Sequence, residues 1–421
     1  MRKFILFFQA IIFIIPTLLF AQLRTEKCGN DLVFERNLER NPAILQQIEE
    51  IEAFTRNFIA EHGSQATTRQ EYTIPVVVHV LWNKPKDNIS NLQIASQIGI
   101  INEDFQFRNE NLEDIPEEFK ALAANIGFDF CLASIDPDGN PTDGITRTET
   151  DYECIGDFAS TFDLSGTPRL FYTALGGKDP WNPKEYLNIW VAPTCGFSLG
   201  FGFNPGESGA EQEDGIVVDS PYFGNVCNDG RNHHLGRTTT HEIGHYFNLK
   251  HIWGKQGCGS GDDFVADTPP QDTYNRGCPQ HPVVTCGSNN MFMNFMDYTD
   301  DACISMFTHG QRLRMLAALL GPRSGLITSN GCNLIRTEPK DLSVTIFPNP
   351  TRDCIHVDFN ANFDGMVTVS LFNPTGQLLF QTVNNASNIR SIDASQFDNG
   401  IYLLHMSNGV TEVTKRVSVY K

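Results

Sequence analysis

The chain is poor in positive charge, and beyond its first residues it lacks any apolar run long enough to cross a membrane. Its 31 Lys and Arg residues stand against 50 Asp and Glu residues, which gives a formal net charge of −19 at pH 7. Because so acidic a chain repels a phosphate backbone, we expect no nucleic-acid partner. With 40% hydrophobic and 11% aromatic residues among 421, the chain is too apolar to be disordered and long enough for two or three domains.

The one long apolar run lies at the N-terminus. A short positive region precedes residues 4–21, and Ala21 is a plausible cleavage point. We predict a signal peptide over residues 1–21; the alternative is a membrane anchor, but the run is short and Pro16 interrupts it. We therefore expect an exported mature chain with no transmembrane segment, in which the 11 cysteines favour disulfides.

Residues 22–69 differ from the chain that follows. Apolar residues recur there near helical spacing, at Ile44, Ile48, Ile51 and Phe58, with Glu49, Glu50 and Glu52 between them. A polar patch over residues 63–69 separates this helix from a strand-like run. A helical segment between a signal and a domain is an ordinary position for a propeptide, which we predict here; the alternative is a first helix of the domain.

Residues 70–333 mix helical and strand-like patterns. A helical stripe over residues 94–105 is opened by Ser90. Strand-like runs lie at residues 74–81, 128–135, 186–192 and 215–218. This pattern predicts an α+β domain with a twisted mixed sheet. From residue 341 to residue 421 short alternating runs and turn residues replace the helical period, which predicts a small C-terminal β-sandwich after a linker at 336–342.

The strongest motif places three histidines around a glutamate. His241 and His245 are four residues apart, so on a helix both imidazoles face one metal ion, and Glu242 lies beside them without being a ligand. His251 can join them only if the backbone turns sharply, and Asn248 tolerates the left-handed conformation that such a turn needs. The alternative is three unrelated surface histidines.

Three neutral imidazoles around zinc leave one position open for water, which is the pattern of a catalytic site. Zinc lowers the pKa of that water and polarises a carbonyl. Glu242 would take the proton of the attacking water and deliver it to the departing amine. This chemistry suits amide hydrolysis.

The histidine motif resembles the extended zinc signature of the metzincin peptidases, with Asn248 where they usually have Gly, and residues 294–301 resemble their Met-containing turn. The likeness is most specific to the short bacterial branch of the pappalysin family. Its features are residues 74–82, the zinc motif, residues 251–253, residues 263–269 and the Met turn followed by Cys303. The resemblance covers about residues 25–333 and implies a metzincin catalytic domain.

The resemblance also implies roles for single residues. Met296 would form a hydrophobic floor beneath the metal. Tyr298 would donate a hydrogen bond to the oxyanion of the tetrahedral intermediate, unless it is only a packed aromatic residue. Asp301 would line the pocket for the residue after the scissile bond and select Lys or Arg by charge pairing. Cleavage before Lys and Arg is therefore expected, unless Asp300 and Asp301 are solvated loop acids.

A calcium ion is implied in the loop after the zinc helix. The matching positions are Gly261, Asp263, Val265 and Thr268. Their carboxylate, hydroxyl and backbone oxygens suit a hard cation, although an ordinary Asp-rich loop is the alternative.

The cysteines fall into three groups. The resemblance implies two disulfides, Cys258–Cys286 and Cys278–Cys303. Four of the domain's five other cysteines can form two more bridges in three ways. These five are Cys131, Cys154, Cys195, Cys227 and Cys332. We favour Cys195–Cys227, which flank one long loop, and expect Cys354 to be unpaired.

Cys28 lies in the predicted propeptide. In similar proteins such a thiolate can occupy the open position of the zinc and displace the water, which keeps the enzyme latent. An incidental or disulfide-bonded cysteine is the alternative. With the specificity given above, Arg69 would offer a self-cleavage point between propeptide and domain.

The C-terminal segment has a resemblance of its own. Residues 346–350, 373–376, 399–402 and 415–421 resemble the C-terminal sorting domain of the type IX secretion system. This implies export across the outer membrane by that machinery and a secreted or cell-surface location. A β-sandwich that binds carbohydrate or protein is the alternative.

The sequence therefore predicts a secreted zinc endopeptidase that acts on proteins or peptides and is made as a latent precursor. One rival is a metzincin with an apolar primed-side preference. The other is an adhesion or scaffolding protein with a vestigial zinc site, against which the intact Glu242 argues.

Overall fold

The computed structural model describes residues 26–63, 70–158, 160–225, 232–259, 262–332, 344–359, 366–385, 391–408 and 412–421. The predicted signal peptide and linker lie outside these ranges, as do Arg69, Cys227 and Gly261. Within the described ranges, we find no helix that is both long and apolar enough to cross a bilayer.

The described α-helices are α1 (Asn30–Arg40), α2 (Ile44–His62), α3 (Asn91–Phe105), α4 (Glu117–Lys120), α5 (Arg237–Tyr246) and α6 (His309–Leu320). The strands up to residue 332 are β1 (Glu26–Cys28), β2 (Tyr72–Trp82), β3 (Phe128–Leu132), β4 (Ile145–Glu149), β5 (Leu187–Val191), β6 (Ser198–Gly202), β7 (Ile216–Val218), β8 (Val284–Thr285) and β9 (Ser288–Asn289).

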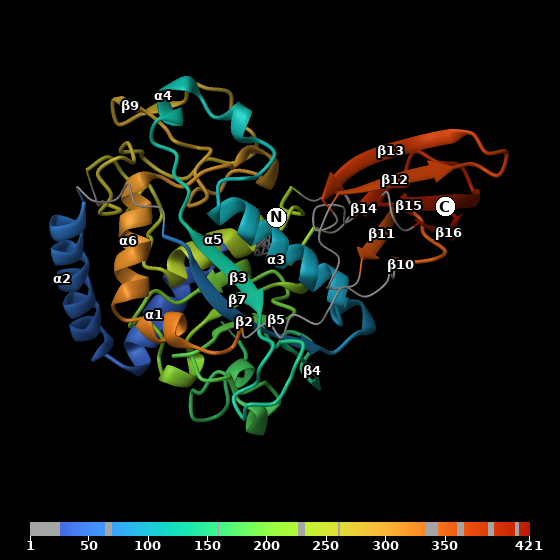
Figure 1. Cartoon of the computed structure of the whole chain (residues 1–421). Coiled ribbons are helices and arrows are strands. Elements are labelled where there is room, and N and C mark those ends of the chain that lie inside the picture. The colour runs from blue at the N-terminus through green and yellow to red at the C-terminus, as the bar shows by residue number, and fades with distance from the viewer. Residues whose placement is uncertain are drawn as a thin grey trace, which may run out of the picture.

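A seven-stranded sheet lies at the centre of residues 26–332 (Figure 1). The strand order is β1-β6-β7-β5-β2-β3, and β4 also pairs with β2. All neighbours are parallel except β6 and β7. Residues 74–81 of β2 are all buried, as expected for a central strand covered on both faces. The mixed sheet and few helices confirm the predicted α+β class.

Helices α3 and α5 pack against each other and against this sheet. The predicted start of α3 is confirmed, because the Ser90 hydroxyl accepts a hydrogen bond of 3.1 Å from the Gln93 amide. Ile94, Ile101 and Phe105 of α3 are buried in one core with Ile243 of α5. The zinc motif therefore sits on a helix that is packed into the centre of the domain.

Strand β6 was not predicted, because its two glycines weaken a strand pattern. Those glycines let β6 approach α5 closely. A Cβ atom at Gly200 would stand 3.1 Å from Glu242 Cγ, and one at Gly202 would stand 2.6 Å from the Glu242 carbonyl oxygen. Strand β1, from the predicted propeptide, pairs in parallel with β6. We call residues 22–69, the predicted propeptide, the pro-segment from here on.

The pro-segment also contributes two helices. The predicted helix is confirmed as α2, which runs beside α6 (Figure 1). At the end of α1, Arg40 forms an ion pair of 2.7 Å with the fully buried Glu213 of the domain. Within residues 26–63, the pro-segment is therefore held by contacts of its helices as well as of its strand.

Disulfides join several of the loops. Four pairs are present in the described residues: Cys131–Cys332, Cys154–Cys195, Cys258–Cys286 and Cys278–Cys303. The last two are the pairs that the resemblance implies. The prediction of Cys195–Cys227 is wrong, because the loops around Cys154 and Cys195 meet through the Gly156 amide and the Pro193 carbonyl, 2.9 Å apart.

Cys354 is disulfide-bonded, so the prediction that it is unpaired is also wrong. Cys354 is the single cysteine of residues 341–421, so its partner lies in another part of the chain, which the sequence of this module does not show. Cys28 is the one free cysteine among the described residues, and it is buried.

The C-terminal strands form the small β-sandwich that the sequence predicts. They are β10 (Val344–Phe347), β11 (Cys354–Phe359), β12 (Met366–Phe372), β13 (Leu378–Asn385), β14 (Ser391–Asp393), β15 (Gly400–Ser407) and β16 (Glu412–Val419). One antiparallel sheet has the order β10-β11-β14 and the other β13-β12-β15-β16. The buried side chains of both sheets share one core. Figure 1 shows these strands in orange and red, gathered apart from the central sheet.

Candidate active site

The three histidines of the motif converge. His241 and His245 lie on α5, and His251 follows after the helix has ended. The Nε2 atom of His245 is 3.2 Å from that of His241 and 3.1 Å from that of His251. Nitrogen ligands about 2.05 Å from a tetrahedral zinc would be roughly 3.3 Å apart, so this arrangement fits one zinc ion.

The opposite sides of the rings fix their orientation. The Nδ1 atoms of His241 and His245 lie 2.7 Å and 2.9 Å from the carbonyl oxygens of Phe295 and Leu249, so each ring presents Nε2 to the centre. Trp253 stacks on the ring of His251, with centroids 4.4 Å apart. Burial lowers the pKa of all three histidines, that of His245 to about 3, so they are neutral near pH 7 as metal ligands must be.

The sharp turn predicted after His245 is confirmed. Asn248 has a φ of +69°, in the left-handed region. Its amide donates to the His245 carbonyl at 2.8 Å, and the Leu249 amide donates to the Gly244 carbonyl at 2.9 Å. This reversal brings His251 back towards α5.

Glu242 is fully buried next to the histidines. Its Oε2 atom lies 3.5 Å from the Cys28 sulfur, whereas no described residue hydrogen-bonds Oε1. Burial raises the pKa of Glu242 well above its usual range. A carboxylate in such a place has a strong tendency to take a proton, which suits a general base.

Met296 and Tyr298 both lie beside the histidine motif. A Cβ atom at Gly244 would stand only 2.4 Å from the Met296 sulfur, so the methionine packs directly against the zinc helix. The Tyr298 hydroxyl is 3.3 Å from His251 Nε2 and 3.4 Å from the carbonyl oxygen of Cys28. It is thus beside the histidine cluster and already donates to a backbone carbonyl there.

Asp301, three residues after Tyr298, is fully buried. Its carboxylate accepts hydrogen bonds from the backbone amides of Leu235 and Arg237 and lies 3.2 Å from His233 Nδ1. Burial alone would raise the pKa of Asp301, but His233 and nearby cations hold it below its usual value. Asp301 is therefore a buried anion and not a solvated loop acid.

Lys27 is a residue beside this site that sequence reasoning did not single out. Its side chain is only 3% exposed, and Nζ donates to the carbonyl oxygens of Thr299 at 2.9 Å and Asp297 at 3.4 Å. Burial lowers the pKa of Lys27, and Asp301 opposes this more than any other acidic group. The signal was its position directly before Cys28.

Cys28 reaches the centre of the cluster. Its sulfur and one nitrogen of each histidine lie within 4.8 Å of one another. The predicted calcium loop lies elsewhere: Asp263 accepts hydrogen bonds from the Val265 amide at 3.1 Å and the Thr268 hydroxyl at 2.7 Å. Both carboxylate oxygens are thus engaged within the loop, and calcium stays a prediction.

Comparison with known proteins agrees with this geometry. Residues 176–320 match the peptidase family described as Pregnancy-associated plasma protein-A. Promirolysin of Tannerella forsythia is 38% identical, with a TM-score of 0.63 over 72% of this chain and 97% of that one. The chain belongs to the pappalysin family of metzincins.

Two other relatives match less of the chain. Mature mirolysin of Tannerella forsythia, in complex with a cleaved peptide, is 41% identical with a TM-score of 0.57, over 62% of this chain and 97% of that one. An extracellular metalloprotease of Neurospora crassa is 36% identical over 138 residues, which are 31% of this chain and 46% of that protein. The chain spans about half the length of the first curated relatives that it matches.

The C-terminal strands match a second family. Residues 345–420 match the Secretion system C-terminal sorting domain. This pappalysin therefore carries a type IX sorting module, which indicates a secreted or cell-surface location.

Proposed function

We propose that this pappalysin is a secreted zinc-dependent endopeptidase, made as a latent zymogen, that cleaves before Lys and Arg. The observation that carries the proposal is the convergence of three neutral imidazoles beside the buried carboxylate of Glu242. His241, His245 and His251 would hold the zinc. When bound, zinc would lower the pKa of a water and polarise the scissile carbonyl.

The remaining chemistry belongs to residues of the chain. Glu242 would accept the proton of the attacking water and pass it to the departing amine. Tyr298 would donate its hydroxyl to the oxygen that becomes negative during attack, as it now does to the Cys28 carbonyl. Met296 would support the zinc helix through its contact with Gly244.

Latency would follow from the position of Cys28. Burial and the neighbouring Glu242 raise the pKa of its thiol, so only a cation among the histidines would favour the thiolate. As a thiolate it would take the place of water on the zinc. The contact between Cys28 and Glu242 would also block the base.

Lys27 supports the preference for basic residues. Its amine is buried near Asp301, which is where the side chain after the scissile bond would bind. In a substrate, the carbonyl that would face the zinc comes directly before the Lys or Arg that would bind near Asp301. In the pro-segment the order is the opposite, because Cys28, which faces the zinc position, comes after Lys27. The pro-segment would therefore cross the cleft in the reverse direction, in which it would block the site without being cut there.

We also propose that calcium binds the loop at Asp263, Val265 and Thr268. The family resemblance and the oxygen-rich loop support it. Burial counts against it, because it raises the pKa of Asp263 to about 7 and so disfavours the carboxylate that calcium needs. After a chelator has removed the metal ions, adding calcium alone should restore the thermal stability of the parent protein. It should not restore that of Asp263→Asn.

The proposed activity is tested by zinc content and by casein cleavage after activation. We expect one zinc per chain, and loss of cleavage in Glu242→Ala. A chain without zinc, or equal cleavage by both proteins, would instead support an adhesion or scaffolding protein.

A further inference from the structure

The turn that follows the zinc helix determines where two of the histidines point. The Leu249 carbonyl accepts from His245 Nδ1 at 2.9 Å and from the Asn204 amide at 3.0 Å. His251 lies two residues further along. The peptide between Asn248 and Leu249 must therefore be held still if both rings are to face one ion.

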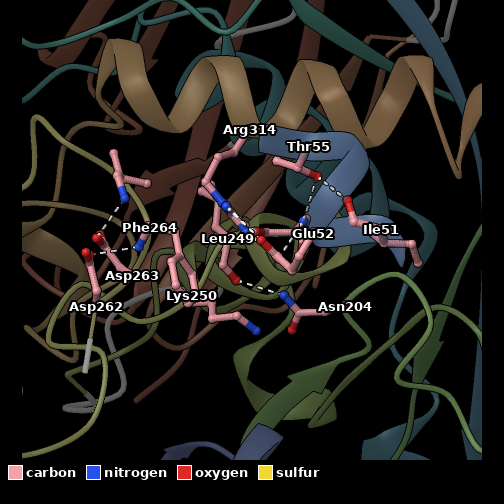
Figure 2. A network of polar contacts seen from close by, with 12 residues as sticks. Ile51, Glu52, Thr55, Asn204, Leu249, Lys250, Asp262, Asp263, Phe264 and Arg314 are labelled. Carbon is pink, nitrogen blue, oxygen red and sulfur yellow. Dashed lines mark hydrogen bonds and ion pairs between the residues drawn. The ribbon is translucent and has the colours of Figure 1, made fainter. Parts of the chain in front are cut away.

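Arg314 of α6 binds this peptide, and Figure 2 shows it beside Glu52 and Leu249. Its Nε and Nη2 atoms donate to the Asn248 carbonyl at 3.2 Å and 3.1 Å. Its side chain is only 1% exposed, and its guanidinium carbon lies 5.6 Å from the ring centroid of Phe264. One edge of the guanidinium thus serves the turn, and one face meets the loop at residue 264.

The other edge of Arg314 binds the pro-segment. Glu52 of α2 accepts from Arg314 Nη2 at 2.7 Å and from Nη1 at 3.2 Å. Glu52 Oε1 also accepts from the Asn248 side-chain amide at 3.1 Å. One carboxylate therefore binds both the turn and the residue that holds it, with charge-assisted bonds.

This contact gives a reason for the one departure from the family motif. A glycine at position 248 would adopt a φ of +69° with less strain, but it would offer no amide to Glu52. The Asn248 amide also lies 3.4 Å from the hydroxyl of the buried Thr55, one turn further along α2. The asparagine side chain is thus bound entirely by the pro-segment.

We propose that Glu52 and Arg314 form a clamp on the turn between His245 and His251, so that α2 shapes the zinc site from behind while β1 blocks it from the front. Both residues are positioning residues, because neither touches the reacting atoms. The inference rests on the proposed function for the identity of the metal, whereas the clamp itself is a property of the turn.

The test uses the full chain carrying Glu242→Ala, so that no variant can cleave itself. Glu52→Gln is compared with Glu49→Gln, an exposed glutamate on the same helix, by hydrogen–deuterium exchange. Because the Leu249 amide is bonded to Gly244, we expect its exchange to be about tenfold faster in Glu52→Gln and unchanged in Glu49→Gln. Zinc should also pass more quickly to a chromogenic chelator.

The stretch around β1, which we call the front of the pro-segment, provides the internal reference for the exchange rates. The Gly29 amide, bonded to the Gly200 carbonyl at 2.9 Å, should exchange at the same rate in both variants. Faster exchange at both Leu249 and Gly29 would mean that Glu52 merely anchors the pro-segment, and equal rates at Leu249 would mean that no clamp exists; either result overturns the proposal. If Glu52→Gln does not fold, Glu52→Asp, which keeps the charge and shortens the reach, supplies the same comparison.

Failure of the proposed function would look different. A folded parent chain without zinc would contradict the peptidase assignment whatever the exchange rates show. A zinc-loaded parent with unchanged exchange in Glu52→Gln would contradict only the clamp.

Discussion

The front and the back of the pro-segment meet the catalytic domain with different chemistry. At the front, Lys27 and Cys28 are 3% and 6% exposed and occupy positions that substrate and water would need. At the back, α2 stays mostly exposed and reaches the zinc turn through Glu52. By the proposed function the first contact would exclude substrate, whereas the second involves no residue of the histidine cluster. Blocking a site and shaping it are therefore separable by substitution.

Two glutamates give the largest contrast between front and back. In a full chain opened by Cys28→Ala, Glu242→Gln should lower peptide hydrolysis about 10²–10⁴-fold, because the general base is lost. Glu52→Gln in the same background should lower it less than about tenfold, because Glu52 touches no reacting atom. Initial rates on a fluorogenic peptide measure both. Comparable losses would remove the distinction.

The Lys27–Cys28 stretch, which we call the front plug, should give the next largest effect on activity when it is altered. Cys28→Ala should raise the activity of the uncut zymogen about a hundredfold, equivalent to losing roughly 3 kcal/mol of blocking interaction. Leu32→Ala, an exposed position on α1, is the control and should stay latent. Zymogen activity is measured before any cleavage is visible on a gel. A latent Cys28→Ala protein would show that another contact closes the site.

Lys27 tests whether charge contributes to latency at the front of the pro-segment. Lys27→Met keeps the length of the side chain and removes its charge next to Asp301, so latency should weaken by about tenfold. The concentration of a basic peptide substrate that gives half-maximal rate in the uncut protein reports the change. No change would mean that the Lys27 charge is incidental to the plug.

The smallest expected effect is the pH dependence of the stability that Glu52 contributes at the back of the pro-segment. Burial raises the pKa of Glu52, but the bonds and charge of Arg314 outweigh this and leave it lowered. A carboxyl whose pKa is lower in the folded state stabilises that state above its unfolded pKa, near 4.5, and stops doing so as the pH falls through the folded value. The difference in unfolding midpoint between the parent and Glu52→Gln should therefore disappear as the pH falls well below 4.5. A difference that persists there would not come from the charge of Glu52.

Local pattern was sufficient for much of the fold and for the metal ligands. The spacing of His241, His245 and His251 requires a helix and a turn, and Asn248 supplied the conformation for that turn. Helix α2 follows the same logic through its apolar period, and the central strand β2 through its continuous apolar run, which is buried over residues 74–81. These features depend on residues that are near one another in the chain.

Contacts between distant segments were beyond such reasoning. Strand β6 was not predicted because its glycines allow the close approach of α5, which no local pattern shows. The Cys154–Cys195 pair depends on two loops meeting, and the clamp joins Glu52, Asn248 and Arg314 across three elements. Lys27 had a signal, since it precedes Cys28, but only the fold shows that its amine lies near Asp301.

The most direct test of the central claim is the mapping of cleavage sites by mass spectrometry. The full chain with Cys28→Ala is incubated with a mixed peptide library, beside the same protein carrying Glu242→Ala or Asp301→Asn. The account predicts cuts before Lys and Arg, none with Glu242→Ala, and a loss of the basic preference with Asp301→Asn. Identical products from the Cys28→Ala protein and its Glu242→Ala version would contradict it.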